Sequence, residues 1–223
     1  KKYFQGIALE IYPLEETGYR ELFLAGADGV TVYQETYDRA RYAQVHPTGR
    51  KKDYDFRYNA PERIARAGMR QISLGILLGL GPLAEDLAAL YAHLRYLEKS
   101  FPGVEYSISF PRLRTIKAAE FIQNPVDDVT FVKILCLTRT LFPRVGINLS
   151  TRETAEFRNQ ALNLSVTRVS IGSHTTVGGY ADDAAEDPQF DIADERSAAD
   201  VIQYLKNNSF DPVFTDWRRI ENK

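Results

Sequence analysis

Five apolar runs in this chain end in a group of polar residues, and this pattern limits the possible folds more than any other feature. The runs are GVTVYQETY (29–37), ISLGILLGLG (72–81), YSISFPRLR (106–114), VGINLSTRE (145–153) and VTRVSIGSHTTVGGY (166–180). Helix-patterned stretches separate most of them, which predicts alternating strands and helices around a parallel sheet. Ligands bind at the carboxyl ends of the strands in such folds. The polar residues therefore predict a site along that edge.

Hydrophobic periodicity and turn residues predict the order of the elements. Strands are expected over residues 6–14, 29–34, 71–79, 106–110, 146–150 and 167–171. Helices are expected over residues 15–25, 61–67, 82–99, 127–142, 152–162 and 198–207, with a polar loop at 44–58.

The number of strands defines the expected architecture. About six strands fall short of the eight in a closed (β/α)₈ barrel, which typically needs ~250 residues. We therefore expect an α/β fold with a parallel, partial TIM-type barrel over residues 1–165, followed by a short carboxy-terminal appendage over 166–223. We also expect the chain to be the back portion of a longer protein. A complete open parallel sheet of the flavodoxin type is the alternative.

Composition excludes several classes of protein. The formal net charge is −2, so there is no electrostatic signal for nucleic acid or an anionic membrane. No apolar stretch approaches the roughly 20 residues that span a bilayer. The single cysteine, Cys136, excludes an internal disulfide framework and any thiolate cluster held by this chain alone. We expect Cys136 to be a small buried residue and the protein to be cytoplasmic.

The three histidines show no metal-ligand spacing, so no metal site is expected within the chain. His46 precedes a proline in a basic loop and is expected to be exposed. His93 lies on an amphipathic helix, where a hydrogen-bonded and partly buried imidazole is expected. His174 lies among the polar residues of the last run.

The segment DYDFRYNAPERIARAGMRQISLGILLGLG (53–81) resembles the radical S-adenosylmethionine (SAM) enzymes of the biotin synthase and thiamine biosynthesis group. The resemblance implies that Arg57 holds the methionyl carboxylate of SAM, and a planar guanidinium suits a carboxylate. It also implies that Gly75 and Gly79 let the backbone approach the adenosine. Without the resemblance, a structural turn is the better explanation of a glycine-rich strand end.

Gln34 and Glu35 end a central strand, where an unpaired buried carboxylate is costly. A ligand ribose or ammonium group is one expected partner. An ion pair of Glu35 with Arg57 or Arg63 is the other.

Further motifs run in order along the chain: VYQETY (32–37), HPTGRKKDYDFR (46–57), SISFPRLR (107–114), INLSTRE (147–153) and SIGSHTTVGGY (170–180). Together they resemble the 2-iminoacetate synthase family. The family implies cleavage of SAM by a [4Fe–4S] cluster and hydrogen abstraction from tyrosine. Cleavage of the tyrosine Cα–Cβ bond then gives 2-iminoacetate and p-cresol. A thiazole synthase is the partner that this family implies.

One departure from the family and one comparison with a related lyase shape the expectation. The cluster motif CxxxCxxC is missing from these 223 residues, so its ligands are expected on an amino-terminal segment and this chain alone is expected to be inactive. The related tyrosine lyase of hydrogenase maturation carries an additional carboxy-terminal cluster domain with its own cysteines. This chain ends at Lys223 without them, which favours the thiamine branch.

The substrate is expected to bind beside the third run. Arg112 and Arg114 offer planar groups that suit the carboxylate of an amino acid, and Ser109 lies on the same strand. Ordinary surface cations are the alternative. Ser173 and Thr175 belong to a polar loop that we expect to close over the substrate, although a tight turn explains its glycines as well. We predict that Glu35, Arg57, Ser109 and Arg112 converge on one face.

A different class of protein stays open, namely a metal-independent parallel α/β enzyme or a noncatalytic barrel domain. An aldolase would need a lysine at a strand end to form a Schiff base. Lys51, Lys52 and Lys117 are expected in loops instead, which counts against an aldolase.

Overall fold

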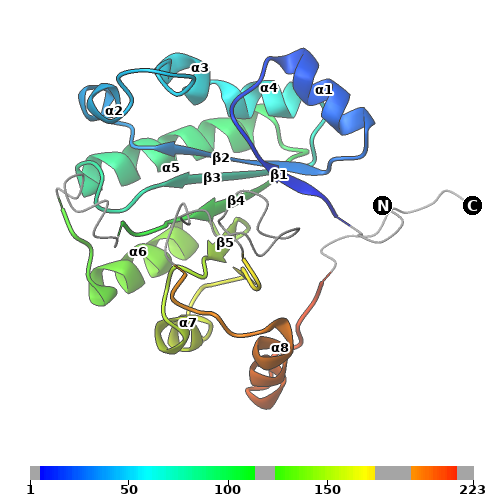
Figure 1. Cartoon of the computed structure of the whole chain (residues 1–223), viewed down its shortest axis with the longest axis vertical. Helices are drawn as coiled ribbons and strands as arrows, with labels where there is room; N and C mark the ends of the chain where they lie inside the picture. Colours follow the sequence, from blue (N-terminus) through cyan, green and yellow to red (C-terminus); the bar gives the residue numbers. More distant parts are fainter. Residues whose placement is uncertain (1–5, 114–123, 174–191, 215–223) are drawn as a thin grey trace, which may run out of the picture.

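The computed structural model describes residues 6–113, 124–173 and 192–214, and these contain one sheet of six parallel strands (Figure 1). The strands are β1 (Ala8–Glu10), β2 (Gly29–Glu35), β3 (Gln71–Ile76), β4 (Glu105–Ser109), β5 (Gly146–Leu149) and β6 (Arg168–Val169). Each strand pairs with its neighbour in the sequence, in the order β1-β2-β3-β4-β5-β6. A flavodoxin-type sheet reverses its strand order at a switch point. The observed order is instead that of a barrel wall, which confirms the expected partial barrel.

Helices α1 to α7 connect the strands and lie around the outside of the curled sheet, and α8 follows the last strand (Figure 1). They are α1 (Glu16–Leu24), α2 (Arg39–Val45), α3 (Tyr54–Tyr58), α4 (Ala60–Arg66), α5 (Leu83–Ser100), α6 (Asp128–Leu141), α7 (Ala155–Ala161) and α8 (Ala198–Asn207). None of the helices in the described ranges is long and apolar enough to cross a membrane.

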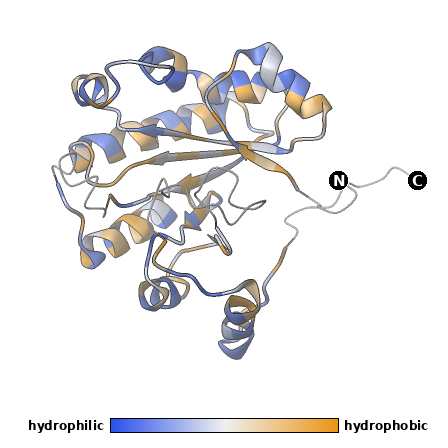
Figure 2. Ribbon diagram, viewed as in Figure 1, coloured by the Kyte–Doolittle hydropathy of each residue, from blue (hydrophilic) through white to orange (hydrophobic). Residues whose placement is uncertain are grey.

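Alternating side chains divide the sheet into two chemically different faces. The face toward the helices is apolar, and its fully buried residues include Val30, Ile72, Leu74, Ile108 and Ile147. Along the helices, hydrophobic and hydrophilic residues alternate (Figure 2), and the buried residues of α5 and α6 belong to the same core as those of the sheet. This layer forms the hydrophobic core. The opposite, concave face carries mostly small polar residues, so it is not filled by the core.

The region between β2 and α4 differs from the expected loop over residues 44–58. It contains two short helices, α2 and α3, with the basic loop 46–53 between them. Asp38 accepts hydrogen bonds from the first amides of α2, and Asp53 does the same for α3. Capping aspartates are sequence signals for such helices. The helices themselves are too short for hydrophobic periodicity to reveal them.

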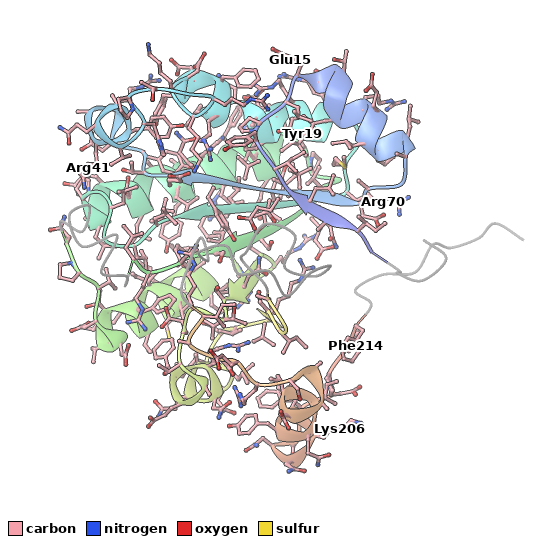
Figure 3. All side chains as sticks on the ribbon, in the orientation of Figure 1. Glu15, Tyr19, Arg41, Arg70, Lys206 and Phe214 are labelled. Carbon is pink, nitrogen blue, oxygen red and sulfur yellow. The ribbon has the colours of Figure 1, made fainter. Side chains whose placement is uncertain are left out.

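Figure 3 labels Tyr19 of α1, Arg41 of α2, and Arg70, which precedes β3. Tyr19 of α1 is fully buried, and its hydroxyl accepts a hydrogen bond from the Leu14 amide at 3.0 Å. Arg70 lies directly before β3, at the amino end of the sheet. Arg41 of α2 lies toward the other end, where its Nε donates to the Leu80 carbonyl at 2.9 Å. Arg41 therefore attaches α2 to the loop that follows β3.

Cys136 corrects one prediction, because the structure places it on α6 with its side chain exposed. The apolar periodicity of α6 puts Phe131, Ile134, Leu135 and Thr138 on the buried face. Cys136 lies on the other face of the helix.

Candidate active site in the concave face

A cavity of about 1090 Å³ occupies the concave face of the sheet. Residues from all six strands or the loops that follow them contribute to its lining, among them Glu10, Thr31, Tyr33, Glu35, Ser73, Ser107, Ser109, Asn148, Arg152 and Ser173. Barrel interiors are usually filled by branched apolar side chains. A polar, open interior is instead suited to bind a polar small molecule.

The Glu35 carboxylate lines this cavity and interacts with three basic side chains. Its Oε2 accepts a hydrogen bond from His46 Nε2 at 2.8 Å, and its Oε1 accepts one from Lys51 Nζ at 2.8 Å. Arg57 Nη1 lies 3.5 Å from the same Oε1. Glu35 has a φ of 72°, a left-handed conformation that costs energy for a residue other than glycine. This backbone turn interrupts the β2–β3 register between Tyr33 and Glu35.

The charge state of Glu35 follows from these partners. Burial alone would raise the pKa of the carboxyl group. The hydrogen bond from His46 and the charges of Lys51 and Arg57 outweigh burial and lower the pKa of Glu35 to about 2. Glu35 is therefore a carboxylate at neutral pH. The expected ion pair of Glu35 is formed with Arg57 and not with Arg63, because Arg63 donates to the Leu14 and Phe56 carbonyls.

Arg57 of α3 lines the cavity with most of its side chain buried. Its Nη1 donates to the Tyr33 carbonyl at 2.6 Å. Its Nε is buried and has no hydrogen-bond partner among the described residues. An unpaired buried donor is costly, and a ligand acceptor would satisfy it.

The other residues expected to bind SAM are Gln34, Gly75 and Gly79, and their surroundings differ from those of Arg57. Gln34 is buried but does not line the cavity, and its Nε2 has no partner in the described part of the chain. Gly79 has a φ of 101°, so it serves the turn after β3. Gly75 lies beneath the Tyr33 ring, and an added Cβ would come within 2.5 Å of both that ring and the Ser109 carbonyl. The space above Gly75 is thus occupied by protein.

Replacement of Gly75 by alanine is expected to lower the free energy of unfolding by roughly 1–3 kcal/mol, because the backbone of Ser109 cannot move aside. Urea unfolding monitored by circular dichroism measures the change. Gly103→Ala is the matched control, since an added Cβ there meets nothing within 4 Å. Equal effects of the two substitutions would contradict the close packing of Tyr33 on Gly75.

Arg112 differs most from expectation, because the structure does not bring it to the cavity lining. Its Nε donates to Glu153 Oε1 at 3.0 Å, its Nη2 donates to the other oxygen of Glu153, and its Nη1 donates to Asp128 at 2.7 Å. The guanidinium lies 4.8 Å from the ring centre of Phe131 of α6 and 4.9 Å from that of Phe157 of α7, beside two rings that stack on each other. The planar group that suits a substrate carboxylate is therefore already occupied by a carboxylate of the protein, and the predicted convergence holds only for Glu35, Arg57 and Ser109.

Arg152 is a cavity residue that the sequence analysis did not select. It follows β5, lines the cavity and is half-buried. Burial lowers the pKa of Arg152, and the nearby Tyr33 and Glu10 oppose this effect. Tyr33 is also in the lining, and burial raises its pKa to about 12. The sequence did contain a signal for Arg152, because it lies among the polar residues that end an apolar run, as the other candidates do.

The remaining substrate candidates divide into two pairs. Ser109, the last residue of β4, and Ser173, which lies in the loop after β6, both line the cavity. Arg114 and Thr175 lie outside the described residues, so their predicted roles stay predictions.

Two histidines have defined environments. His46 was expected to be exposed, but its side chain is only 13% exposed because it packs beside Tyr42 and bonds to Glu35. His93 is buried, and its Nδ1 is hydrogen-bonded to the Tyr37 hydroxyl at 2.9 Å, as expected. Burial lowers the pKa of His93 to about 4, so it is neutral. His174 lies outside the described residues, and those that are described contain no group of side chains suited to hold a metal ion.

Comparison with known proteins agrees with this architecture. The model of the Biotin and Thiamin Synthesis associated domain matches residues 109–211. The 2-iminoacetate synthase of Salmonella typhimurium is 38% identical over 218 residues, which cover 97% of this chain and 58% of that protein.

Two solved structures are similar over nearly the same range. A crystal structure of HydG, a maturase of the [FeFe]-hydrogenase, superposes with a TM-score of 0.87 at 32% identity, covering 95% of this chain and 46% of that one. HydG from Carboxydothermus hydrogenoformans superposes with a TM-score of 0.83 at 34% identity, covering 94% and 48%. The chain thus spans about half the length of these relatives. Similarity in sequence and in fold over nearly all of its residues shows that the chain belongs to the 2-iminoacetate synthase family of radical SAM proteins.

Proposed function

We propose that this chain forms the SAM-binding and substrate-binding wall of a tyrosine lyase, which cleaves tyrosine to 2-iminoacetate and p-cresol. The observation that carries the proposal is the polar cavity on the concave face, where Glu35, Arg57 and Arg152 are brought together. The similarity to 2-iminoacetate synthase supports the choice of reaction.

The residues of the cavity fit SAM. The unpaired Nε of Arg57 is a buried donor suited to the methionyl carboxylate, and the Glu35 carboxylate can accept hydrogen bonds from a ribose diol. Bound SAM would supply the deoxyadenosyl radical that abstracts hydrogen from the substrate. His46 and Lys51 hold Glu35 ionised and fixed, so that it is preorganised for this contact.

The residues of this chain do not fit a [4Fe–4S] cluster. Three thiolates hold the cluster in the family, and the 223 residues contain one cysteine, which is exposed on α6. The cluster would be held by cysteines outside these residues. The term holoenzyme here means a protein that contains both this chain and the segment with the cluster-binding cysteines, with the cluster bound.

The substrate carboxylate is assigned to Arg152, because Arg152 lines the cavity and Arg112 does not. Ser109 at the end of β4 and Ser173 in the loop after β6 both line the cavity and can donate to a carboxylate or accept from an ammonium group. The chain would therefore bind and orient the amino acid.

Anaerobic incubation of the holoenzyme with SAM, a reductant and tyrosine tests the proposal. Formation of p-cresol and of glyoxylate, the hydrolysis product of 2-iminoacetate, is the expected result. Cleavage of SAM without either product would overturn it.

The HydG structures favour a related tyrosine lyase of hydrogenase maturation as the second candidate. The higher identity to 2-iminoacetate synthase favours the thiamine branch, in which a thiazole synthase would take up the product. Such chemistry needs a reducing compartment, which favours the cytoplasm. Growth of a thiazole auxotroph on expression of the holoenzyme would distinguish the two branches, because only the thiamine enzyme is expected to restore it.

Because basic side chains hold the Glu35 carboxylate in the folded protein, we expect the free energy of unfolding to depend on pH. Its pKa is lowered from an ordinary value of 4.5 to about 2, so folding favours the ionised form. The resulting stabilisation, roughly 3 kcal/mol, is present above about pH 4.5 and is lost as the pH falls toward 2. The difference in unfolding free energy between the wild type and Glu35→Gln should therefore shrink over that range in urea unfolding. A constant difference would show that the carboxylate is not held by His46 and Lys51.

A further inference from the structure

Three polar side chains from neighbouring strands meet deep in the concave face. They are Ser73 of β3, Ser107 of β4 and Asn148 of β5, and the strands lie side by side (Figure 1). Ser73 and Ser107 are directly opposite in the register, and both are buried. Asn148 Nδ2 donates to Ser73 Oγ at 3.0 Å and to Ser107 Oγ at 3.1 Å. All three residues line the cavity.

The hydrogen-bonding capacity of this cluster is only partly used. The Asn148 Oδ1 is buried and has no partner among the described residues. Ser73 and Ser107 each accept from Asn148, so their own hydroxyl hydrogens stay available to donate. The cluster therefore offers one acceptor and two donors to a ligand. Buried polar groups are rarely left unsatisfied, which indicates that a ligand group completes them.

A phenol hydroxyl matches this cluster because it both donates and accepts a hydrogen bond. The position along the sheet matches as well. Ser107 lies two residues before Ser109 on β4, which places it roughly 6.6 Å deeper in the cavity. That depth is close to the span from the α-carbon to the phenol oxygen of tyrosine. An amino acid held by Arg152 and Ser109 at the strand ends would bring its hydroxyl to Ser107, which the side chain of Asn148 reaches at 3.1 Å from its position opposite Ser109 in the register.

We infer that Ser73, Ser107 and Asn148 form the subsite that recognises the phenol hydroxyl of the substrate. Asn148 Oδ1 accepts the phenol hydrogen, and the serine hydroxyls donate to the phenol oxygen. This inference rests on the proposed tyrosine cleavage and names the residues that select tyrosine over phenylalanine. A site built to pair with a hydroxyl rejects the analogue that lacks it, since its own polar groups are then left unpaired.

Binding of L-tyrosine and L-phenylalanine to the holoenzyme, without reductant so that no turnover occurs, tests the subsite. Isothermal titration calorimetry is expected to show tighter binding of tyrosine. Asn148→Leu removes the acceptor at similar volume and is expected to weaken tyrosine binding roughly tenfold or more. Phenylalanine binding should change little or improve, because the variant no longer leaves a buried amide unpaired.

Ser107→Ala is the second variant and removes one donor, so a smaller loss of tyrosine binding is expected. Asn163→Leu is the matched control, because Asn163 is exposed and lies outside the cavity. Far-UV circular dichroism verifies that each variant is folded.

The outcomes separate this inference from the proposed function. Equal binding of both amino acids, or an unchanged preference in folded Asn148→Leu and Ser107→Ala, would overturn the phenol subsite while p-cresol formation still supports tyrosine cleavage. Binding of neither amino acid would overturn both.

Discussion

Replacement of Asp194 by alanine is expected to lower the free energy of unfolding by about 3–5 kcal/mol, the largest stability effect that we predict. Asp194 accepts from Arg158 of α7 and from Arg196, and both Asp194 and Arg158 are buried. Arg158 also donates to the Ser170 carbonyl after β6. Loss of Asp194 would leave the Arg158 guanidinium buried without its counter-charge.

Chemical unfolding of the two proteins measures this difference. Asp55→Ala is the matched control, since Asp55 forms a bidentate pair with Arg39 that is exposed to solvent. Exposed pairs contribute little, so a small change is expected there. The double variant Arg158→Met/Asp194→Leu should recover much of the loss, because it removes both charges together. A loss for Asp194→Ala as small as that of the control would contradict the buried pair.

Substitution of Arg152 by lysine in the holoenzyme is expected to reduce kcat/KM for tyrosine on the order of a hundredfold. Lysine keeps the positive charge but loses the planar pair of donors that orients a carboxylate. A small displacement of the amino acid is enough to misplace the hydrogen to be abstracted. Quantification of p-cresol over a range of tyrosine concentrations measures the effect, and SAM cleavage without tyrosine should change much less.

Arg112→Lys distinguishes the two arginines. Arg112 is held by Glu153 and Asp128 away from the cavity lining, so the lysine variant should lose stability and retain most of its affinity for tyrosine. The reverse result, with tyrosine affinity lost in Arg112→Lys and kept in Arg152→Lys, would restore Arg112 as the carboxylate-binding residue.

The elements of the fold follow directly from the sequence because their signals are local. The five apolar runs predicted β2 to β6, and the segment 6–14 predicted β1. The spacing of Leu87, Leu90, Leu94 and Leu97 is the helical pattern of α5. Family motifs further indicated the reaction, since they occur in order along the whole chain. The short helices α2 and α3 were missed because two turns of helix carry too little periodicity.

The sequence alone determined at which edge of the sheet the candidate site is expected, since the polar residues after each strand meet there in a parallel barrel. Only the tertiary structure decided which of those side chains turn into the cavity. Arg112 and Arg152 both follow strands, but Arg112 pairs with Glu153, which is 41 residues away in the chain. Likewise, Glu35 is paired by His46 and Lys51 from a loop that looked exposed. Such pairings depend on how distant segments pack in three dimensions, and no local pattern of residues encodes them.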